Sequence, residues 1–572
     1  MISFLKQLPV KQKLYLLTIP LMFIGTATAV YLAQKPQDIR NYAAENMSTN
    51  TPPALSPLGE QKTLVVLFNF QDDPNNKPFT KEEASAAILS NTGRSVNTYY
   101  QENSYGQTWL TGEVVGWYTI PYDSQPGCYT APENINPILT QNGVNLDSYP
   151  RRIYIHPFTE SCESRDSGST GGNPSTITAD DLNLYSLAHE FGHNLTLGHA
   201  NSATCGLNKV IDDYSNCTFS TYGDPFGVMG HSWEGYHHNA FFKSWLGWIP
   251  PSRILEITRS GDYTLAPLEL PSNGHQLLKI RKPDTFQYYT LEYRQPYGFD
   301  NSLPTTISEG VLIHIAYFRP YERNLITYQS PETYLLDNTP NSQPGYNDAS
   351  LSDDKTFYDE INNIRITQLS HTNSSVTLRV ELDENSCTPE LPKLDVITLI
   401  QTGLPGQTLI YEVTLTNNDP LNCSSTTFVL DKDNTYFFPG WSYNFSPQSL
   451  QLQPQTSQSV TYSVISSYDA ENFTYPADIK VTDVNNSYHA KTAKVSYTIL
   501  NNISPTITTS ITSTQISGDA NSDSRVNILD FEILRGQFNQ SGSNLTADFN
   551  NDNNVNILDF EILRTNFGKT GN

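Results

Sequence analysis

Apolar and polar residues recur with different periods along the chain of 572 residues, and these periods predict its elements. The short apolar run Thr63–Phe70 (TLVVLFNF) predicts a buried strand. A polar helical stretch follows at about Lys81–Tyr100, and Arg151–Phe158 predicts another strand. Ser167–Thr178 is rich in Gly, Ser and Thr, which predicts a loop, and a helix is expected over about Asp181–Leu195. This mixture of strands and helices predicts an α+β domain.

The remainder of the chain is β-rich. Alternating residues with many turn formers cover residues 254–382, and short strands recur over residues 387–500 with the spacing of an immunoglobulin-like (Ig-like) sandwich. The Thr/Ser-rich stretch at 505–517 predicts an extended linker. The predicted fold class is therefore multidomain α+β. Its parts are an N-terminal segment (1–33), a linker (34–60), an α+β domain (61–252), a β-rich extension (253–385), an Ig-like β-sandwich (386–500), a second linker (501–517) and a small helical repeat pair (518–572).

The N-terminal segment has the pattern of a secretion signal. Three lysines precede the uncharged run Leu14–Ala33, and the small residues at 27–29 offer a cleavage site. The run has 20 residues, which is also long enough for an uncleaved membrane anchor. Both alternatives predict that the rest of the chain is exported, either secreted or held at the cell surface. Membrane contact is expected only through this segment, and only if it is not cleaved.

The charge and the cysteines fit an exported protein. A formal net charge of −24 argues against nucleic acid as a partner, because that interaction needs clustered Lys and Arg. The same charge suits a protein that binds cations. An even number of cysteines in an exported chain favours disulfides over free buried thiols, although six cysteines allow 15 connectivities. Proximity in sequence suggests the pairs Cys128–Cys162, Cys205–Cys217 and Cys387–Cys423.

Three histidines and one glutamate fall within LAHEFGHNLTLGHA. His189 and His193 are four residues apart, so a helix places both on one face, where their ring nitrogens can converge on one zinc ion. Glu190 projects beside them and is the candidate general base for peptide-bond hydrolysis. His199 is the best third ligand, because the chain has to turn back after the helix. Solvated histidines at a polar helix end, or a third ligand other than His199, remain alternatives.

Two further segments support a family resemblance. The chain combines HEFGHNLTLGHA with YGDPFGVMG (Tyr222–Gly230) and NAFFKSWLGWI (Asn239–Ile249). Together with the upstream SVNTYYQENSYGQTWLTGEV (Ser95–Val114), they resemble the gametolysin family of metzincin metallopeptidases over roughly residues 60–250. The resemblance implies a metzincin-type catalytic domain, one catalytic Zn²⁺ on the three histidines, and Glu190 as base. It also implies that Met229 forms the apolar floor of a Met-turn beneath the metal.

One residue departs from the metzincin pattern His-Glu-x-x-His-x-x-Gly-x-x-His. Thr196 stands where the pattern has a glycine. At that glycine the chain leaves the helix with a positive φ. A β-branched residue disfavours that conformation. Either Gly198, two residues later, carries the turn instead, or the turn at Thr196 is strained at a cost of about 1–3 kcal/mol.

His231 lies two residues after Met229, where some metzincins place a tyrosine that assists the oxyanion. A hydrogen bond from His231 to the tetrahedral intermediate is one interpretation, and a surface or supporting role is the other.

The C-terminal region contains an internal repeat. VNILDFEILR occurs twice, with an offset of 29 residues, and each copy overlaps an acidic twelve-residue loop. Oxygen-bearing side chains occupy loop positions 1, 3, 5 and 12, and position 7 offers a backbone carbonyl, which is the ligand pattern of a calcium loop. The predicted ligands are Asp519, Asn521, Asp523, Arg525 and Asp530 in the first loop, and Asp548, Asn550, Asp552, Asn554 and Asp559 in the second.

Two such loops in tandem, both closed by aspartate rather than glutamate, resemble a type I dockerin over about residues 518–568. The resemblance implies an EF-hand-like module with two structural Ca²⁺ ions and a cohesin-type partner. Ile-Leu at positions 10 and 11 of both copies departs from the polar pairs that are common in dockerins of cellulosomes.

The sequence therefore predicts an exported zinc metalloendopeptidase that acts on protein or peptide substrates. The alternative is a catalytically inactive, calcium-dependent adhesion or assembly protein that uses its Ig-like and dockerin-like modules. The enzyme is favoured because His189, Glu190, His193 and His199 are all present. The departure at Thr196 supports the catalytically inactive alternative.

Overall fold

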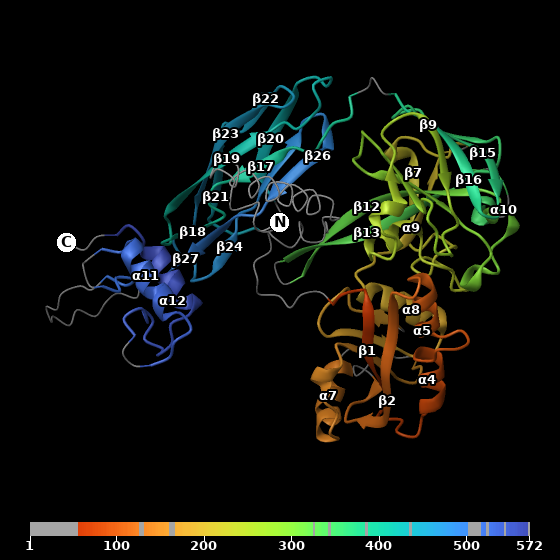
Figure 1. Ribbon diagram of the computed structural model, residues 1–572, viewed down its shortest axis with the longest axis horizontal. Coiled ribbons are helices and arrows are strands. Elements are labelled where there is room, and N and C mark those ends of the chain that lie inside the picture. The colour runs from red at the N-terminus through yellow and green to blue at the C-terminus, as the bar shows by residue number, and fades with distance from the viewer. Residues whose placement is uncertain are drawn as a thin grey trace, which may run out of the picture. The chain divides into compact units, whose positions relative to one another are not determined.

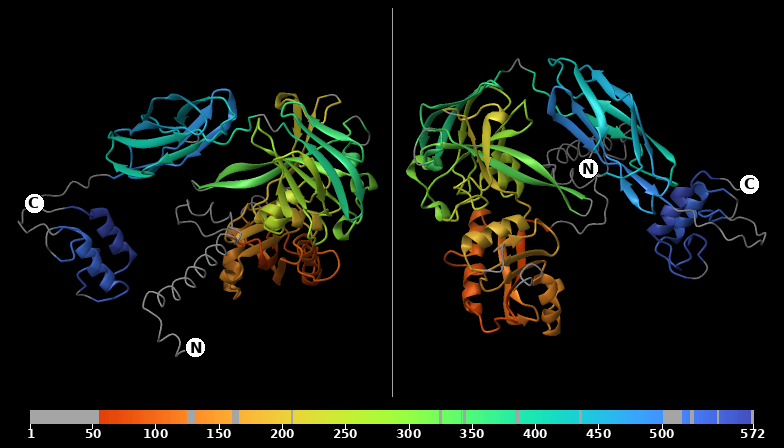
Figure 2. Two further views of the ribbon diagram at one scale, coloured as in Figure 1. Left: turned by 45° about the horizontal axis from the view of Figure 1, so that its top comes forward. Right: turned by 180° about the vertical axis from the view of Figure 1, so that it is seen from behind.

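The computed structural model is multidomain and β-rich, and it divides into a unit of residues 1–499 and a C-terminal unit of residues 500–572 (Figures 1 and 2). The residues that the structure describes are 55–124, 131–159, 166–206, 208–323, 326–340, 342, 345–383, 387–433, 437–500, 516–521, 525–542 and 545–569. The predicted signal or anchor segment and most of the first linker lie outside them. No helix among the described residues is long and apolar enough to cross a membrane.

A five-stranded sheet forms the centre of the first domain. Its strand order is β2 (Thr108–Ile120), β1 (Gly59–Phe70), β3 (Arg151–Ile155), β5 (Ser175–Ala179) and β4 (Ser167–Gly168). All pairs are parallel except β4–β5. The run predicted as a buried strand is β1, whose alternate residues enter two apolar cores on opposite faces of the sheet. The loop expected at Ser167–Thr178 is wrong in part, because it contains β4 and most of β5.

Helices cover both faces of this sheet (Figure 1). The core that contains Val65 also holds residues of α4 (Lys81–Ile88), α5 (Val96–Asn103), α8 (Leu184–Asn194) and α9 (Ala240–Trp245), and the opposite core holds α7 (Ala131–Gln141). The single stretch predicted at Lys81–Tyr100 is two helices, each begun by a capping box, at Thr80 and at Ser95. The helix expected from Asp181 begins at Leu184, because the side chain of Asn183 caps it by accepting from the Tyr185 N–H.

The β-rich extension is built from two sheets around a second core. The seven-stranded sheet has the order β7 (Cys217–Ser220), β6 (Ala200–Cys205), β13 (Ile326–Leu336), β12 (Val311–Arg323), β11 (Tyr288–Tyr293), β10 (Leu277–Arg281) and β8 (Ile254–Glu256). The four-stranded sheet has the order β14 (Thr356–Asp359), β15 (Ile364–Thr372), β16 (Ser375–Glu381) and β9 (Gly261–Leu265). Strands β6 and β7 come from the predicted catalytic domain, so one sheet crosses the boundary predicted at residue 252.

Short helical turns join these strands: η1 (Leu146–Ser148), η2 (Tyr214–Asn216), η3 (Pro251–Arg253), η4 (Gly298–Asp300), α10 (Thr305–Ser308) and η5 (Gly345–Asp348).

Residues 393–499 form a β-sandwich around a third core, as the strand spacing predicts. One sheet has the order β17 (Lys393–Val396), β19 (Thr408–Thr416), β23 (Ser457–Ile465) and β21 (Ser442–Ser446). Another has the order β22 (Ser449–Leu452), β20 (Thr426–Lys432), β25 (Ile479–Asp483) and β26 (Asn486–Ala493), and a third has β18 (Ile400–Gly403), β27 (Ser496–Ile499) and β24 (Thr474–Pro476).

The C-terminal unit packs α11 (Ile528–Gln537) against α12 (Ile557–Asn566). The two halves repeat each other in detail. Val526 exchanges backbone hydrogen bonds with residues 568 and 569, and Val555 does the same with residues 539 and 540, which is the same exchange at the repeat offset of 29. Phe531 and Phe560 meet edge to face at 6.0 Å. The duplicated sequence therefore folds as two equivalent halves around one small core.

Two of the suggested disulfides are present. Cys205 is bonded to Cys217 and Cys387 to Cys423. Cys128 and Cys162 lie outside the described residues.

Candidate metal centres

The three histidines predicted as zinc ligands converge. One ligand nitrogen of each of His189, His193 and His199 lies within 4.8 Å of the others, and the Nε2 atoms of His193 and His199 are 3.2 Å apart. Helix α8 supplies the first two, and the residue just before β6 supplies the third. This set of three nitrogen donors fits zinc, which binds imidazole in catalytic sites with three protein ligands.

Backbone carbonyls orient two of these rings. The Nδ1 atom of His189 is 2.8 Å from the Val228 carbonyl oxygen, and that of His193 is 2.8 Å from the Leu197 carbonyl oxygen. A carbonyl only accepts, so each Nδ1 donates and each Nε2 is left as the metal-binding atom. Burial lowers the pKa of both imidazoles, and that of His189 falls to about 4 with the help of the neighbouring His193. Both rings are therefore neutral at pH 7, which is the protonation state of a ligand.

Glu190 is buried beside the histidines, with 8 % of its surface exposed. Burial and then the charge of Asp166 raise the pKa of its carboxyl to about 7, against a hydrogen bond from the Gly168 N–H. Strand β4 approaches closely here, since a Cβ on Gly168 would lie 2.9 Å from Glu190 Oε2. A carboxyl with a pKa near neutrality is suited to accept and return a proton.

The structure decides between the alternatives at Thr196. Its φ is +76°, so this threonine adopts the conformation that the metzincin pattern assigns to glycine, and the alternative that Gly198 carries the turn is wrong. Two side chains from distant elements hold Thr196. Trp245 Nε1 donates to its hydroxyl at 3.0 Å, and Ser330 Oγ donates to its carbonyl oxygen at 3.2 Å. Tertiary hydrogen bonds therefore offset the strain of a β-branched residue in the left-handed region.

Gly198 serves close packing instead. A Cβ at this position would lie 2.7 Å from the Pro331 carbonyl oxygen and 2.8 Å from Glu332 Cγ, both on β13. The Gly198 N–H donates to the same carbonyl at 3.1 Å. The turn that carries His199 is therefore pressed against a strand of the predicted extension, which makes that extension part of the site.

Met229 lies directly behind the helix of the two histidines. It is fully buried, and a Cβ on Gly192 would meet its sulfur at 2.3 Å. The adjacent Val228 carbonyl is the acceptor for His189, and the Met229 carbonyl accepts from the Ala200 N–H at 2.9 Å. Met229 is thus a buried apolar residue packed against the helix that carries His189 and His193, and its role as a Met-turn stays a prediction.

His231 does not join the histidine group. Its side chain is exposed and accepts a hydrogen bond from Trp233 Nε1 at 2.7 Å. The Trp233 ring contacts Tyr185, and it is Tyr185 whose ring contacts His189, at 6.0 Å. The structure instead places Tyr222 against the histidines, with ring centroids 3.9 Å from His199 and 5.6 Å from His189. Sequence reasoning missed Tyr222, although it opens the quoted segment YGDPFGVMG.

A group of three carboxylates lies near Glu190. The carboxylate oxygens of Asp166, Asp180 and Asp181 lie within 4.8 Å of one another. Burial and then the charges of Asp181 and Asp180 raise the pKa of Asp166 to about 6. The group adds negative charge beside Glu190.

The closing aspartates of the two acidic loops make equivalent hydrogen bonds. Asp559 is fully buried and accepts from the N–H groups of Phe549 and Asn550 with one oxygen, and from that of Asn556 with the other. Asp530 makes the equivalent bonds in the first loop, with Ala520, Asn521 and Asn527. Each closing aspartate thus links the backbone of its loop to the start of the following helix by hydrogen bonds, and these bonds are the same in the two halves.

Other predicted calcium ligands also lie within the described loops. Asp519 and Asp548 begin the loops, followed by Asn521 and Asn550; Arg525, Asp552 and Asn554 are described as well, whereas Asp523 lies outside the described residues. Asn553, at loop position 6, has a φ of +65°, a conformation that asparagine tolerates.

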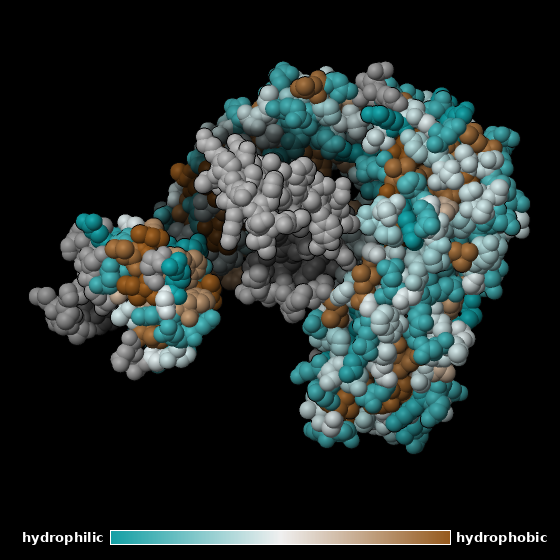
Figure 3. All heavy atoms as spheres, in the orientation of Figure 1, coloured by the Kyte–Doolittle hydropathy of each residue, from teal (hydrophilic) through white to brown (hydrophobic). Residues whose placement is uncertain are grey.

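Each helix of the C-terminal unit begins with a pair of exposed apolar residues. Ile528 and Leu529 are 57 % and 56 % exposed, and Ile557 and Leu558 are 58 % and 56 % exposed. Apolar residues appear on the surface of this unit in Figure 3. Ile528 and Leu529, and likewise Ile557 and Leu558, occupy loop positions 10 and 11.

Comparison with known proteins identifies this C-terminal unit. The family model of the dockerin type I domain matches residues 517–567, so the chain carries a dockerin. Dockerin domains bind calcium and imply a cohesin-type partner, and dockerin-bearing proteins are typically extracellular or attached to the cell surface. No curated protein matches the chain.

Matches among solved structures are weak. An ASH/PapD-like domain of human CEP192 is 14 % identical, over 19 % of this chain and 86 % of that chain, with a TM-score of 0.15. Domains 4 and 5 of the S-layer protein SbsC are 14 % identical, over 24 % and 65 %, with a TM-score of 0.14. The secreted serine protease VesC from Vibrio cholerae is 12 % identical, over 33 % and 46 %, with a TM-score of 0.14. These scores assign no fold.

Proposed function

We propose that the protein is an exported zinc metalloendopeptidase whose dockerin attaches it to a cohesin-bearing assembly. One observation carries the proposal: three imidazoles, two from α8 and one from the residue just before β6, present nitrogens within 4.8 Å of one another, with the buried carboxyl of Glu190 beside them. Such a donor set and base match peptide-bond hydrolysis by a metal-activated water.

The residues have distinct roles in this reaction. His189, His193 and His199 would hold zinc, which supplies a Lewis acid that polarises the scissile carbonyl and lowers the pKa of a bound water to about 7. Glu190 takes the proton of the attacking water on its carboxylate and passes it to the leaving amine nitrogen. The Val228 and Leu197 carbonyls keep two of the imidazoles in the correct tautomer throughout.

Zinc analysis combined with a protease assay tests the proposal. The purified ectodomain should contain one zinc per chain and digest casein. Glu190→Ala should abolish digestion and keep the zinc, and His193→Ala should lose both. A protein that contains no zinc would overturn the proposal.

A second candidate function rests on the dockerin match itself. A chain with a dockerin and a β-sandwich can serve as a non-catalytic assembly or adhesion protein. A protein that is fully loaded with zinc but cleaves no peptide in a broad proteome-derived library would favour this function.

A further inference from the structure

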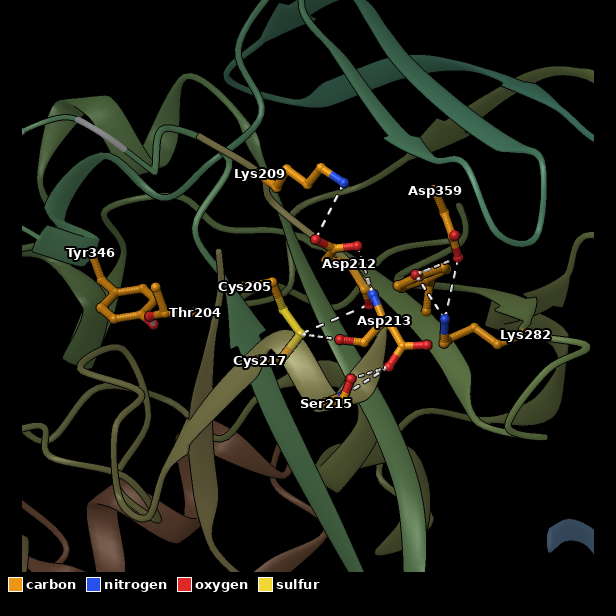
Figure 4. The surroundings of a disulfide bond; sticks show 11 residues. Thr204, Cys205, Lys209, Asp212, Asp213, Ser215, Cys217, Lys282, Tyr346 and Asp359 are labelled. Carbon is orange, nitrogen blue, oxygen red and sulfur yellow. Dashed lines mark hydrogen bonds and ion pairs between the residues drawn. A yellow bond between two sulfur atoms is a disulfide. The ribbon is translucent and has the colours of Figure 1, made fainter. Parts of the chain in front are cut away.

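His199, the third histidine, lies at the beginning of a β-hairpin that is closed by a disulfide. His199 immediately precedes β6, and β6 pairs with β7 in antiparallel register, with Ser202 opposite Ser220. The disulfide Cys205–Cys217 closes the far end of this hairpin, where the Lys209–Asp212 ion pair also lies (Figure 4). Tyr222 follows β7 by two residues, so the hairpin brings it back beside His199.

One buried side chain connects His199 and Tyr222. Asn201 Nδ2 donates to the His199 carbonyl oxygen at 3.3 Å, and Asn201 Oδ1 accepts from the Tyr222 N–H at 3.1 Å. Gly223 fixes the same turn against β6, because a Cβ there would lie 2.1 Å from Ser202 Oγ. The backbone around Tyr222 is thus determined by β6, the strand that begins just after His199.

Tyr222 is strained as well as fixed. Its φ is +60°, which is unfavourable for a residue with a Cβ, and the favoured residue for this conformation is glycine. Its ring lies over the His199 ring at 3.9 Å and an interplanar angle of 41°. A strained aromatic residue at the edge of a metal site indicates that the side chain, rather than the backbone, is what the position requires.

We infer that Tyr222 is a positioning residue for zinc, whose aromatic ring packs on His199 and holds that imidazole in its ligating orientation. The Tyr222 ring contacts two of the three histidines, with ring centroids 3.9 Å from His199 and 5.6 Å from His189. The inference rests on the zinc site of the proposed function, and it concerns the affinity for the metal rather than the hydrolysis step.

Tyr222→Gly separates the ring from the backbone. Glycine relaxes the positive φ while it removes the ring, so the relief of backbone strain offsets stability that is lost with the ring packing. Tyr222→Phe keeps the ring and removes only the hydroxyl. Phe286→Gly is a matched control, because Phe286 also has a positive φ, of +58°, and stacks at 5.1 Å on a histidine, His489, outside the zinc site.

The experiment measures the Kd for Zn²⁺ by competition with a chromophoric chelator on the full ectodomain, with urea unfolding as a check on folding. Loss of a group that supports a ligand typically weakens metal binding 10–100-fold, so Tyr222→Gly should raise the Kd by that factor. Tyr222→Phe and Phe286→Gly should stay within about threefold of the wild type, since both keep the ring on His199. The visible spectrum of the cobalt-substituted protein should change only in Tyr222→Gly.

Either of two results would overturn the inference: wild-type affinity in Tyr222→Gly, or an equal loss in Tyr222→Phe, which would assign the effect to the hydroxyl. A wild-type protein that binds no zinc would overturn the proposed function and this inference with it. If the wild type binds zinc and Tyr222→Gly binds it with the same Kd, only the inference would be overturned.

Discussion

Replacing Thr196 tests whether its side chain offsets the strain of its backbone. Thr196→Val keeps the β-branched shape and the φ of +76° but removes the hydroxyl that accepts from Trp245 Nε1 at 3.0 Å. Thr196→Gly removes the hydroxyl and the strain together. The two variants therefore differ mainly in the conformational cost of the left-handed backbone.

The magnitudes predict that both variants are destabilised, and that Thr196→Val is destabilised more. Loss of the hydrogen bond, with the indole N–H left without this acceptor, costs about 1–3 kcal/mol in both variants. Glycine regains about 1–2 kcal/mol of strain and loses about 0.4–1 kcal/mol because its unfolded state is more flexible. Thr196→Val should therefore have a free energy of unfolding about 1–3 kcal/mol below that of the wild type. The value for Thr196→Gly should lie between those of the wild type and Thr196→Val. If the backbone strain is at the upper end of its range, glycine should recover at least half of the stability that Thr196→Val loses.

Urea unfolding followed by tryptophan fluorescence measures these differences, because five of the six tryptophans lie between residues 109 and 248. The samples are kept free of metal with a chelator, so that zinc binding does not add to the apparent stability. The reasoning would be refuted if Thr196→Val were as stable as the wild type, or if Thr196→Gly were the less stable of the two variants.

Other predictions concern a buried ion pair and the calcium loops. Burial lowers the pKa of His314, but the hydrogen bond to Asp224 and nearby negative charge outweigh burial and raise it above its ordinary value of 6.5. The stabilisation is therefore complete below pH 6.5 and is lost as the pH rises through the folded pKa. In unfolding titrations the wild type should lose stability over this interval, and His314→Gln should show a flatter profile; parallel profiles would contradict this. Asp559→Ala and Asp530→Ala should each reduce the calcium stoichiometry from two to one by isothermal titration calorimetry, and should also destabilise the helix that the aspartate caps by about 1 kcal/mol. Retention of two sites would refute this ligand assignment.

The local parts of both candidate metal centres could be predicted from the sequence. The spacing of His189 and His193 places them on one face of a helix, and a twelve-residue loop brings its own ligands together. Asn553, at position 6 of the second loop, has a positive φ, which asparagine tolerates. In each case the geometry is set within a few residues, so the spacing of side chains carries the information.

The supports of the proposed zinc site could not be predicted, because they come from distant parts of the chain. Thr196 is held by Trp245 and Ser330, which are 49 and 134 residues away. The sequence left open whether Thr196 or Gly198 carries the turn, since intrinsic preference favours glycine. Tertiary hydrogen bonds and the approach of β13 to Gly198 decided the question.

By itself, the sequence determined the order of the modules, the exported character expected of the chain, the dockerin and the converging histidines, because hydrophobic periodicity and ligand spacing are local properties. Only the tertiary structure decided that β6 and β7 join the sheet of the extension and that Tyr222, rather than His231, lies against the three converging histidines. Strand pairing and ring packing depend on which distant segments bury their surfaces together, and no short stretch of sequence contains that choice.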